Sequence, residues 1–97
     1  MTTVSKEEGR VDLGADCGMP NVALLYHQLS DLLTGDQAVT IDASRVTRVD
    51  ASIIQLLCSF IKAMVDADKA FCWGDVSDAF RDAVVQLGLQ EAMGLPA

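Results

Sequence analysis

Basic residues are scarce in this sequence, which has seven lysines and arginines against 14 aspartates and glutamates and a formal net charge of −7 over 97 residues. The basic residues are scattered along the chain, so the positive patch that nucleic-acid binding requires is missing. No run comes close to the roughly 20 consecutive apolar residues that cross a bilayer. The sequence therefore predicts neither a nucleic-acid partner nor direct insertion into a membrane.

The sequence also lacks the usual signatures of metal binding and catalysis. Its only histidine is His27, and Cys17, Cys58 and Cys72 show no CxxC spacing, which argues against a zinc site. No phosphate-binding glycine loop, HExxH motif or nucleophile elbow is present. We therefore expect a protein that is not an enzyme and has no catalytic residue, metal site or cofactor. Cys58 and Cys72 are expected to be buried as small apolar residues.

Length and composition predict one domain spanning residues 1–97. A chain of this size fits a single domain, and a hydrophobic content of 51% is enough for one compact core. The first ten residues lack the apolar stretch of a secretory signal, so the expected location is the cytoplasm.

A regular alternation of strand-like and helix-like patterns runs along the chain. Strands are predicted at residues 4–6, 10–13, 38–42 and 70–74, and helices at residues 19–34 and 51–66, after Ser77 and, as one short turn, at residues 89–93. Right-handed crossovers make the later strands parallel, whereas the hairpin makes the first strand antiparallel. The predicted fold class is α/β, with a small, mostly parallel mixed four-stranded sheet covered by about four helices.

The polar residues of interest follow the predicted strand at residues 38–42 and gather where the next helix begins. In open sheets of this type, functional groups collect beyond the carboxyl ends of the parallel strands. That edge would carry the loop at residues 14–18, the junction at residues 49–52 and the turn at residues 74–75. The residues expected to be neighbours there are Asp16, Asp50, Ser52 and Asp75.

Two interpretations stay open for the polar residues at this helix start. Asp50 either caps the helix or faces a partner. The Ser52-x-x-Gln55 spacing matches a capping box, so the Ser52 hydroxyl is either bonded to the backbone or available for phosphorylation. Ile53 is expected to be partly exposed, because an apolar side chain in the first turn of a helix is easily left uncovered.

Three short motifs surround this junction: the strand end at residues 41–44 (Ile-Asp-Ala-Ser), the Val-Asp pair at residues 49–50 and the Leu-Leu pair at residues 56–57. Together they resemble the STAS domain of anti-sigma-factor antagonists. Residues 15–17 and 73–80, the latter running into a Leu-Gly-Leu tail, are similar to the short stand-alone bacterial members. The resemblance covers nearly the whole chain and implies the same α/β fold.

The chain departs from that family at the phosphorylation site. Phosphorylated family members carry the acceptor hydroxyl directly after the Asp, where this chain has Ala51, and Ile53 replaces a small glycine. Ser52 comes one residue later, about 100° further around a helix. The resemblance therefore implies that the domain stays permanently in the unphosphorylated, binding-competent form. Phosphorylation at Ser52 is kept as the alternative.

The resemblance implies a non-enzymatic regulatory domain that acts in signal transduction and transcription regulation through protein–protein interaction. The implied partner is an anti-sigma factor of the ATP-dependent serine-kinase class, whose capture frees a sigma factor. The residues expected to bind this partner are Asp16, Asp50, Ala51, Ser52, Ile53 and Gln55.

Two other roles stay open. Short STAS proteins with a tryptophan in the last strand also resemble the small cytoplasmic subunit of phospholipid-transporting ABC systems, which binds the ATPase subunit. A scaffold linked to a chemotaxis or two-component system is the third possibility. The acidic composition is compatible with a basic protein partner, and it is also an ordinary feature of a protein surface in water.

Overall fold

The computed structural model describes residues 3–5, 9–18, 22–35 and 37–95. Its central element is a four-stranded sheet in the order β1-β2-β4-β6. The strands are β1 (Thr3–Ser5), β2 (Arg10–Asp12), β4 (Val39–Ala43) and β6 (Phe71–Val76). β1 pairs with β2 in the antiparallel sense, whereas β4 lies parallel to both β2 and β6. The predicted mixed, mostly parallel four-stranded sheet is confirmed.

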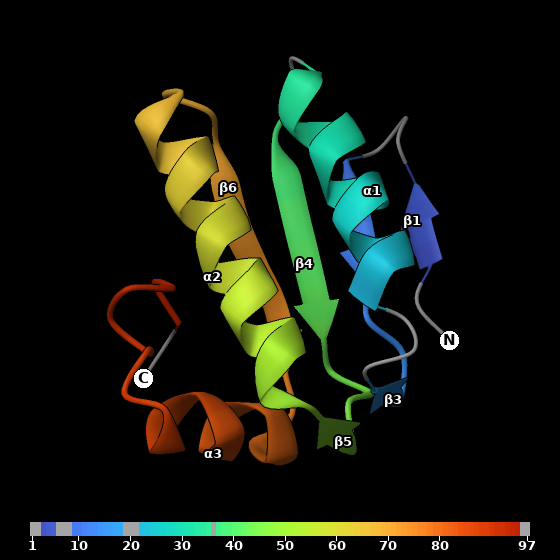
Figure 1. Ribbon diagram of the computed structural model, residues 1–97, viewed down its shortest axis with the longest axis vertical. Coiled ribbons are helices and arrows are strands. Elements are labelled where there is room, and N and C mark those ends of the chain that lie inside the picture. Colours follow the sequence, from blue (N-terminus) through green and yellow to red (C-terminus); the bar gives the residue numbers. More distant parts are fainter. Residues whose placement is uncertain (1–2, 6–8, 19–21, 36, 96–97) are drawn as a thin grey trace.

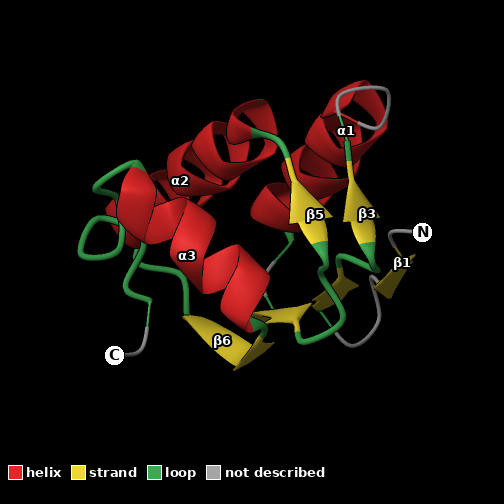
Figure 2. Ribbon diagram, turned by 90° about the horizontal axis from the view of Figure 1, so that it is seen from below, coloured by secondary structure: helices red, strands yellow, loops and turns green. Residues whose placement is uncertain are grey.

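Within the described ranges, three helices pack around this sheet, where about four were expected. α1 (Val22–Thr34) and α2 (Ala51–Asp66) run side by side over one face, and α3 (Asp78–Gln86) lies across the end towards which β4 points (Figures 1 and 2). The predicted short turn near residues 89–93 consists of hydrogen-bonded turns and forms no helix. The predicted bounds of α2 match the structure, whereas the expected helical residues 19–21 and strand residue 6 lie outside the described residues.

A second, two-stranded sheet joins β3 (Asp16–Cys17) to β5 (Arg48–Val49) in parallel. Figure 2 shows the pair beside the starts of α1 and α2, away from the four-stranded sheet. The sequence did not predict these strands, because two residues are too few to show an alternating pattern. They matter here because β5 leads directly into α2.

The core lies between the helices and the covered face of the sheet. β4 alternates between buried and half-buried residues, as expected for a strand with one covered face. The helices bury side chains that recur every three or four positions. The buried helical side chains are Leu25, Leu29 and Leu32 of α1, Ile53, Ile54, Leu57, Phe60, Ile61 and Met64 of α2, and Phe80 and Val84 of α3.

β6 differs from its prediction in length and in the position of its cysteine. It continues to Val76, and Gly74 and Asp75 both lie opposite Asp42 at a bulge, so the expected turn at residues 74–75 is wrong. Cys72 is exposed on the uncovered face of the sheet, 3.2 Å from the Thr40 hydroxyl oxygen, and Cys58 is only half-buried. Both cysteines were expected to be buried.

Candidate functional site

Backbone hydrogen bonds fix the start of α2 against the loop that contains Asp16. The N–H groups of Thr47 and Arg48 both donate to the carbonyl oxygen of Ala15, at 2.8 and 3.2 Å. The N–H of Asp50 donates to the carbonyl oxygen of Cys17 at 3.0 Å. The structure therefore brings the segments containing Asp16 and Asp50 together, as the sequence predicted.

Cys17 holds this pair of segments to the core. Its side chain is buried, and its thiol lies 3.4 Å from the carbonyl oxygen of Leu13. Burial, followed by the negative charge of Asp16, raises the pKa of the Cys17 thiol to about 11. The thiol is therefore protonated at neutral pH, where it acts as a small apolar anchor and not as a nucleophile.

Asp50 is the N-cap residue of α2, and its backbone defines where the helix begins. It has extended backbone angles, φ −82° and ψ 150°, and its carbonyl oxygen accepts from the N–H groups of Ile53 and Ile54 at 3.0 and 3.3 Å. Its side chain makes no capping hydrogen bond. The capping interpretation of the Asp50 carboxylate is therefore wrong, and its role at an interface stays a prediction.

Ser52 lies in the first turn of α2 and is not the N-cap, so the predicted capping box is wrong. Its side chain is half-buried. Among the described residues, the Ser52 hydroxyl oxygen has no hydrogen-bond partner, and it is shielded from solvent. The exposed residues of this stretch of α2 are instead Ala51 and Gln55.

Ile53 is only 1% exposed, so the expectation that it is partly uncovered is wrong. Because residues four apart on a helix share a face, Ile53 lies on the same side of α2 as Leu57, towards the sheet. The four-residue spacing of these two apolar residues was the signal that the sequence offered. Ile53 packs in the core under the start of α2 and is not available for contact with a partner.

Asp75 lies inside β6 and next to β4, one residue before the strand ends at Val76, and not in a turn. That Asp75 neighbours the residues at the start of α2 stays a prediction.

Two Asp residues at strand ends, which were not predicted as site residues, shape the turns that lead to β3 and β5. The Asp12 carboxylate accepts from the Gly14 N–H at 3.0 Å and pairs with Arg45 at 2.9 Å. The Asp42 carboxylate accepts from the Ser44 N–H at 2.9 Å and pairs with Arg10 at 2.6 Å. An Asp that bonds the N–H two residues later is typical of an Asx turn, which is the signal that could have identified both residues.

The pKa of Asp42 lies below its ordinary value. The main cause is the pair of hydrogen bonds from the side chain and backbone of Ser44, and the positive charge of Arg10 adds to it. The carboxylate is therefore held in its charged form, in which it binds both the turn and Arg10.

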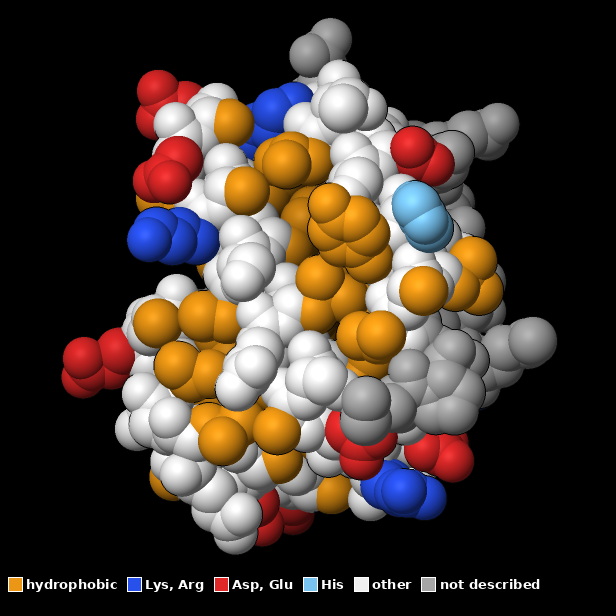
Figure 3. Space-filling view, viewed as in Figure 1, with side chains coloured by type: hydrophobic (Ala, Val, Ile, Leu, Met, Phe, Trp, Pro, Cys, Tyr) orange, Lys and Arg blue, Asp and Glu red, His pale blue; other side chains and the backbone are white. Residues whose placement is uncertain are grey.

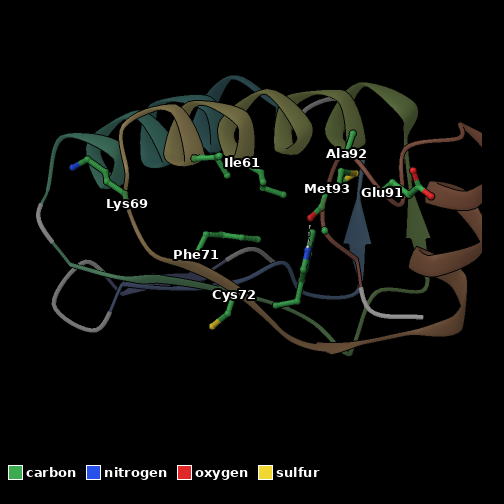
Figure 4. Close-up of a pocket in the computed structure, with 10 residues that line it drawn as sticks. Ile61, Lys69, Phe71, Cys72, Glu91, Ala92 and Met93 are labelled. Atoms are coloured by element: carbon green, nitrogen blue, oxygen red, sulfur yellow. Dashed lines mark hydrogen bonds between the residues drawn. The ribbon is translucent and has the colours of Figure 1, made fainter.

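A cavity lies away from the start of α2, between the second half of α2, β6 and the turn near the C-terminus (Figure 4). It has a volume of about 610 Å³ and is lined by Ile61, Phe71 and Met93, among others. Two of its polar groups are engaged within the protein, because the Trp73 indole N–H donates to the Met93 carbonyl oxygen at 2.8 Å and the Lys69 ammonium donates to the Gly35 carbonyl oxygen. Glu91 also lines the cavity, so its lining is partly polar.

The described part of the chain contains no group of three or more His, Cys, Asp or Glu residues placed to hold a metal ion. Within the same residues, no helix is both long enough and apolar enough to traverse a bilayer.

Comparison with known protein families gives one match. The family model described as "Mlab, STAS domain" matches residues 1–96, which is nearly the whole chain. A search of curated proteins finds no match. The family match covers β3, β5 and the start of α2, the elements that form the candidate site.

Proposed function

Because the chain belongs to the STAS family, we propose that it is a non-enzymatic bacterial anti-sigma-factor antagonist that works in the cytoplasm. STAS domains mediate protein–protein interactions, and this one is an anti-sigma-factor-antagonist-like regulatory domain. In the proposed function it binds a serine-kinase-type anti-sigma factor through the start of α2 and the Asp16 loop, and thereby frees a sigma factor. The observation that carries the proposal is the start of α2, where Ala51 and Gln55 are exposed.

The backbone bonds around the start of α2 support the proposal. Since Asp50 is tied to Cys17 and Arg48 to Ala15, the loop and the helix start keep one relative position before any partner arrives. A surface that is already ordered loses less conformational entropy on binding. The exposed Asp16 and the half-buried Asp50 carry negative charge at this surface, and the exposed Arg48, opposite Asp16 in the β3–β5 pair, carries positive charge. The surface therefore suits a partner region with charges of both signs.

The proposed domain remains in its binding-competent form without phosphorylation control. Ala51, where the family resemblance places the acceptor, is exposed but has no hydroxyl. The Ser52 hydroxyl is shielded from solvent, which hinders the approach of a kinase. Incubating the protein with the partner kinase and labelled ATP should therefore leave it unlabelled. Labelling that disappears in Ser52→Ala would contradict this part of the proposal.

The test of the proposed partner uses the tagged protein as bait in lysate from its own organism, with the retained proteins identified by mass spectrometry. Two variants accompany it. Ala51→Glu places a charged side chain on the exposed first turn of α2. Ala67→Glu makes the same change at the exposed residue that follows α2, about 24 Å away along the axis at about 1.5 Å per residue.

We expect the bait to retain a serine-kinase-type anti-sigma factor, and Ala51→Glu to weaken its binding at least tenfold while Ala67→Glu leaves it unchanged. Thermal unfolding of both variants should show that the fold is intact. Equal binding by Ala51→Glu would move the interface away from the start of α2.

A second candidate is the subunit that binds the ATPase of a phospholipid-transporting ABC system. The family model that matches this chain describes short stand-alone STAS domains. The sequence of this chain also resembles the members of that group that bind the ATPase of such an ABC system. Recovery of an ABC ATPase on the bait would replace the antagonist proposal with this one. Recovery of chemotaxis or two-component proteins would instead favour the scaffold role.

A further inference from the structure

Two hollows lie on either side of the exposed face of α2. The first, which we call the α1–α2 hollow, has a volume of about 180 Å³ and includes Tyr26, Leu33 and Leu56 in its lining. The second, the α2–α3 hollow, has a volume of about 400 Å³ and includes Gln55, Leu87 and Leu89. Figure 3 shows apolar side chains gathered along the helical face of the molecule, between α1 and α2.

Ser59, a small exposed residue, lines both hollows, so the two hollows meet at this position on the surface of α2. Side chains on a helix surface form ridges, and a partner helix approaches closely where a ridge is low. An apolar cavity of about 150 Å³ accommodates a benzene ring. The α1–α2 hollow therefore has room for one bulky apolar side chain, and the α2–α3 hollow has more.

We propose that one amphipathic helix of the protein partner crosses α2 over Ser59 and places one apolar side chain in each hollow. This inference rests on the proposed function, because it extends the partner-binding surface at the start of α2. The surface is continuous, since Gln55 of the first turns of α2 lines the α2–α3 hollow and Ser59 follows one turn later. Docking of an amphipathic helix into an apolar groove is a general mode of recognition.

Charge and polarity indicate what kind of helix fits. The net charge of −7 attracts to the molecule a partner helix with basic residues on its polar side, and the residues that line the two hollows are uncharged. The hydroxyls of Tyr26, Ser30 and Ser59 and the Gln55 amide provide a polar rim around the apolar walls. The same net charge opposes the approach of a second copy of this chain.

The first test is Ser59→Trp, measured as the affinity of the purified serine-kinase-type anti-sigma factor for the full chain. The indole fills the space between the hollows, so we expect binding to weaken at least tenfold, as for loss of a central interface contact. The matched control is Asp66→Trp, which puts the same side chain at an exposed position on α2 that lines neither hollow. Binding by the control should be unchanged, and both variants should unfold at the wild-type temperature.

Two truncations examine the hollows separately. Tyr26 is 55% exposed and Leu87 is 40% exposed, so Tyr26→Ala and Leu87→Ala remove hollow walls without opening the core. Each should weaken partner binding several-fold. An effect of only one of them would contradict the placement of two side chains by one helix.

The outcomes separate this inference from the proposed function. If Ala51→Glu weakens binding and Ser59→Trp does not, the crossing helix is wrong and the antagonist role stands. If Ser59→Trp weakens binding of an ABC ATPase instead, the hollows are partner sites although the antagonist role fails. If sedimentation shows that the wild-type chain forms dimers that Ser59→Trp dissociates, a second copy occupies the hollows and the inference is overturned.

Discussion

α2 and α3 begin in opposite ways, although each starts directly after a strand. At α3, the Ser77 hydroxyl accepts from the N–H of Phe80 at 3.1 Å and donates to the carbonyl oxygen of Val46 at 2.6 Å. At α2, the N-cap side chain of Asp50 makes no capping bond, and the Asp50 backbone N–H is tied to Cys17 instead. One helix start is fixed by a side chain and the other by backbone pairing.

This difference shows that the two helix starts depend on their N-cap side chains to different degrees. A side chain that caps a helix is occupied by hydrogen bonds within the protein and is not available to a partner. When a backbone hydrogen bond from a neighbouring strand holds the helix start, the N-cap side chain is not needed for capping. The Asp50 side chain accordingly makes no capping bond, whereas the Ser77 side chain bonds to both Val46 and Phe80. The first-turn residues Ala51 of α2 and Asp78 and Ala79 of α3 are exposed at both helices.

The largest expected effect on stability comes from placing a charge at the buried Ile53, in contrast with the exposed Ala51 two residues earlier. Ile53→Asp puts a carboxylate in the core, where the native side chain is 1% exposed, and should cost about 3 kcal/mol or more. Ala51→Asp, two residues earlier, is exposed in the first turn and should change stability by less than about 0.5 kcal/mol. Urea unfolding of both variants measures the contrast. Similar losses from the two variants would mean that α2 does not begin at Ala51.

Ile53 also shows which parts of the structure the sequence could predict. The strand and helix patterns predicted a mostly parallel four-stranded sheet and the bounds of α2, because each depends on repeats several residues long. The burial of Ile53 was missed although the predicted helix start was correct, because Ile53 was judged by its place in the first turn and not by its four-residue spacing from Leu57.

The parts of the site that were missed depend on contacts between distant segments. β3 and β5 contain two residues each and are defined only by their pairing across about 30 residues of chain. The exposure of Cys72 follows from the single covered face of the sheet, which no local pattern reveals for one cysteine. The grouping of Asp16 with Asp50 was predicted because the carboxyl ends of parallel strands share one edge.

A smaller effect on stability is expected at the N-cap residues of the two helices, Ser77 of α3 and Asp50 of α2. Ser77→Ala removes the acceptor for Phe80 and leaves the Val46 carbonyl oxygen without this donor, so it should destabilise the fold by about 1–2 kcal/mol. Asp50→Ala removes no capping bond and should cost less. Partner affinity should follow the reverse order, falling for Asp50→Ala and not for Ser77→Ala. Urea unfolding and the binding assay together check both orders, and a larger stability loss at Asp50 would show that its carboxylate is structural.

The smallest expected effect concerns the turn that carries the chain from β4 towards β5 and α2. The folded state holds the pKa of Asp42 below its ordinary value. A lowered carboxylate pKa gives stability that is present above the unfolded pKa, about 3.9, and is lost as the pH falls through the folded pKa. Asp42→Asn should therefore lose less stability than the wild type between pH 7 and pH 3. Since the Arg10 pair is largely exposed, the difference should be about 1 kcal/mol or less.

Arg10→Gln separates the two causes of this pH dependence. The hydrogen bonds from Ser44 contribute more to the lowered pKa of Asp42 than the charge of Arg10 does. Arg10→Gln should therefore retain most of the stability loss that the wild type shows on acidification, whereas Asp42→Asn should not. Urea unfolding at several pH values between 7 and 3 measures both. If Arg10→Gln removes the dependence as fully as Asp42→Asn, the ion pair and not the Asx turn holds the chain on its way to α2.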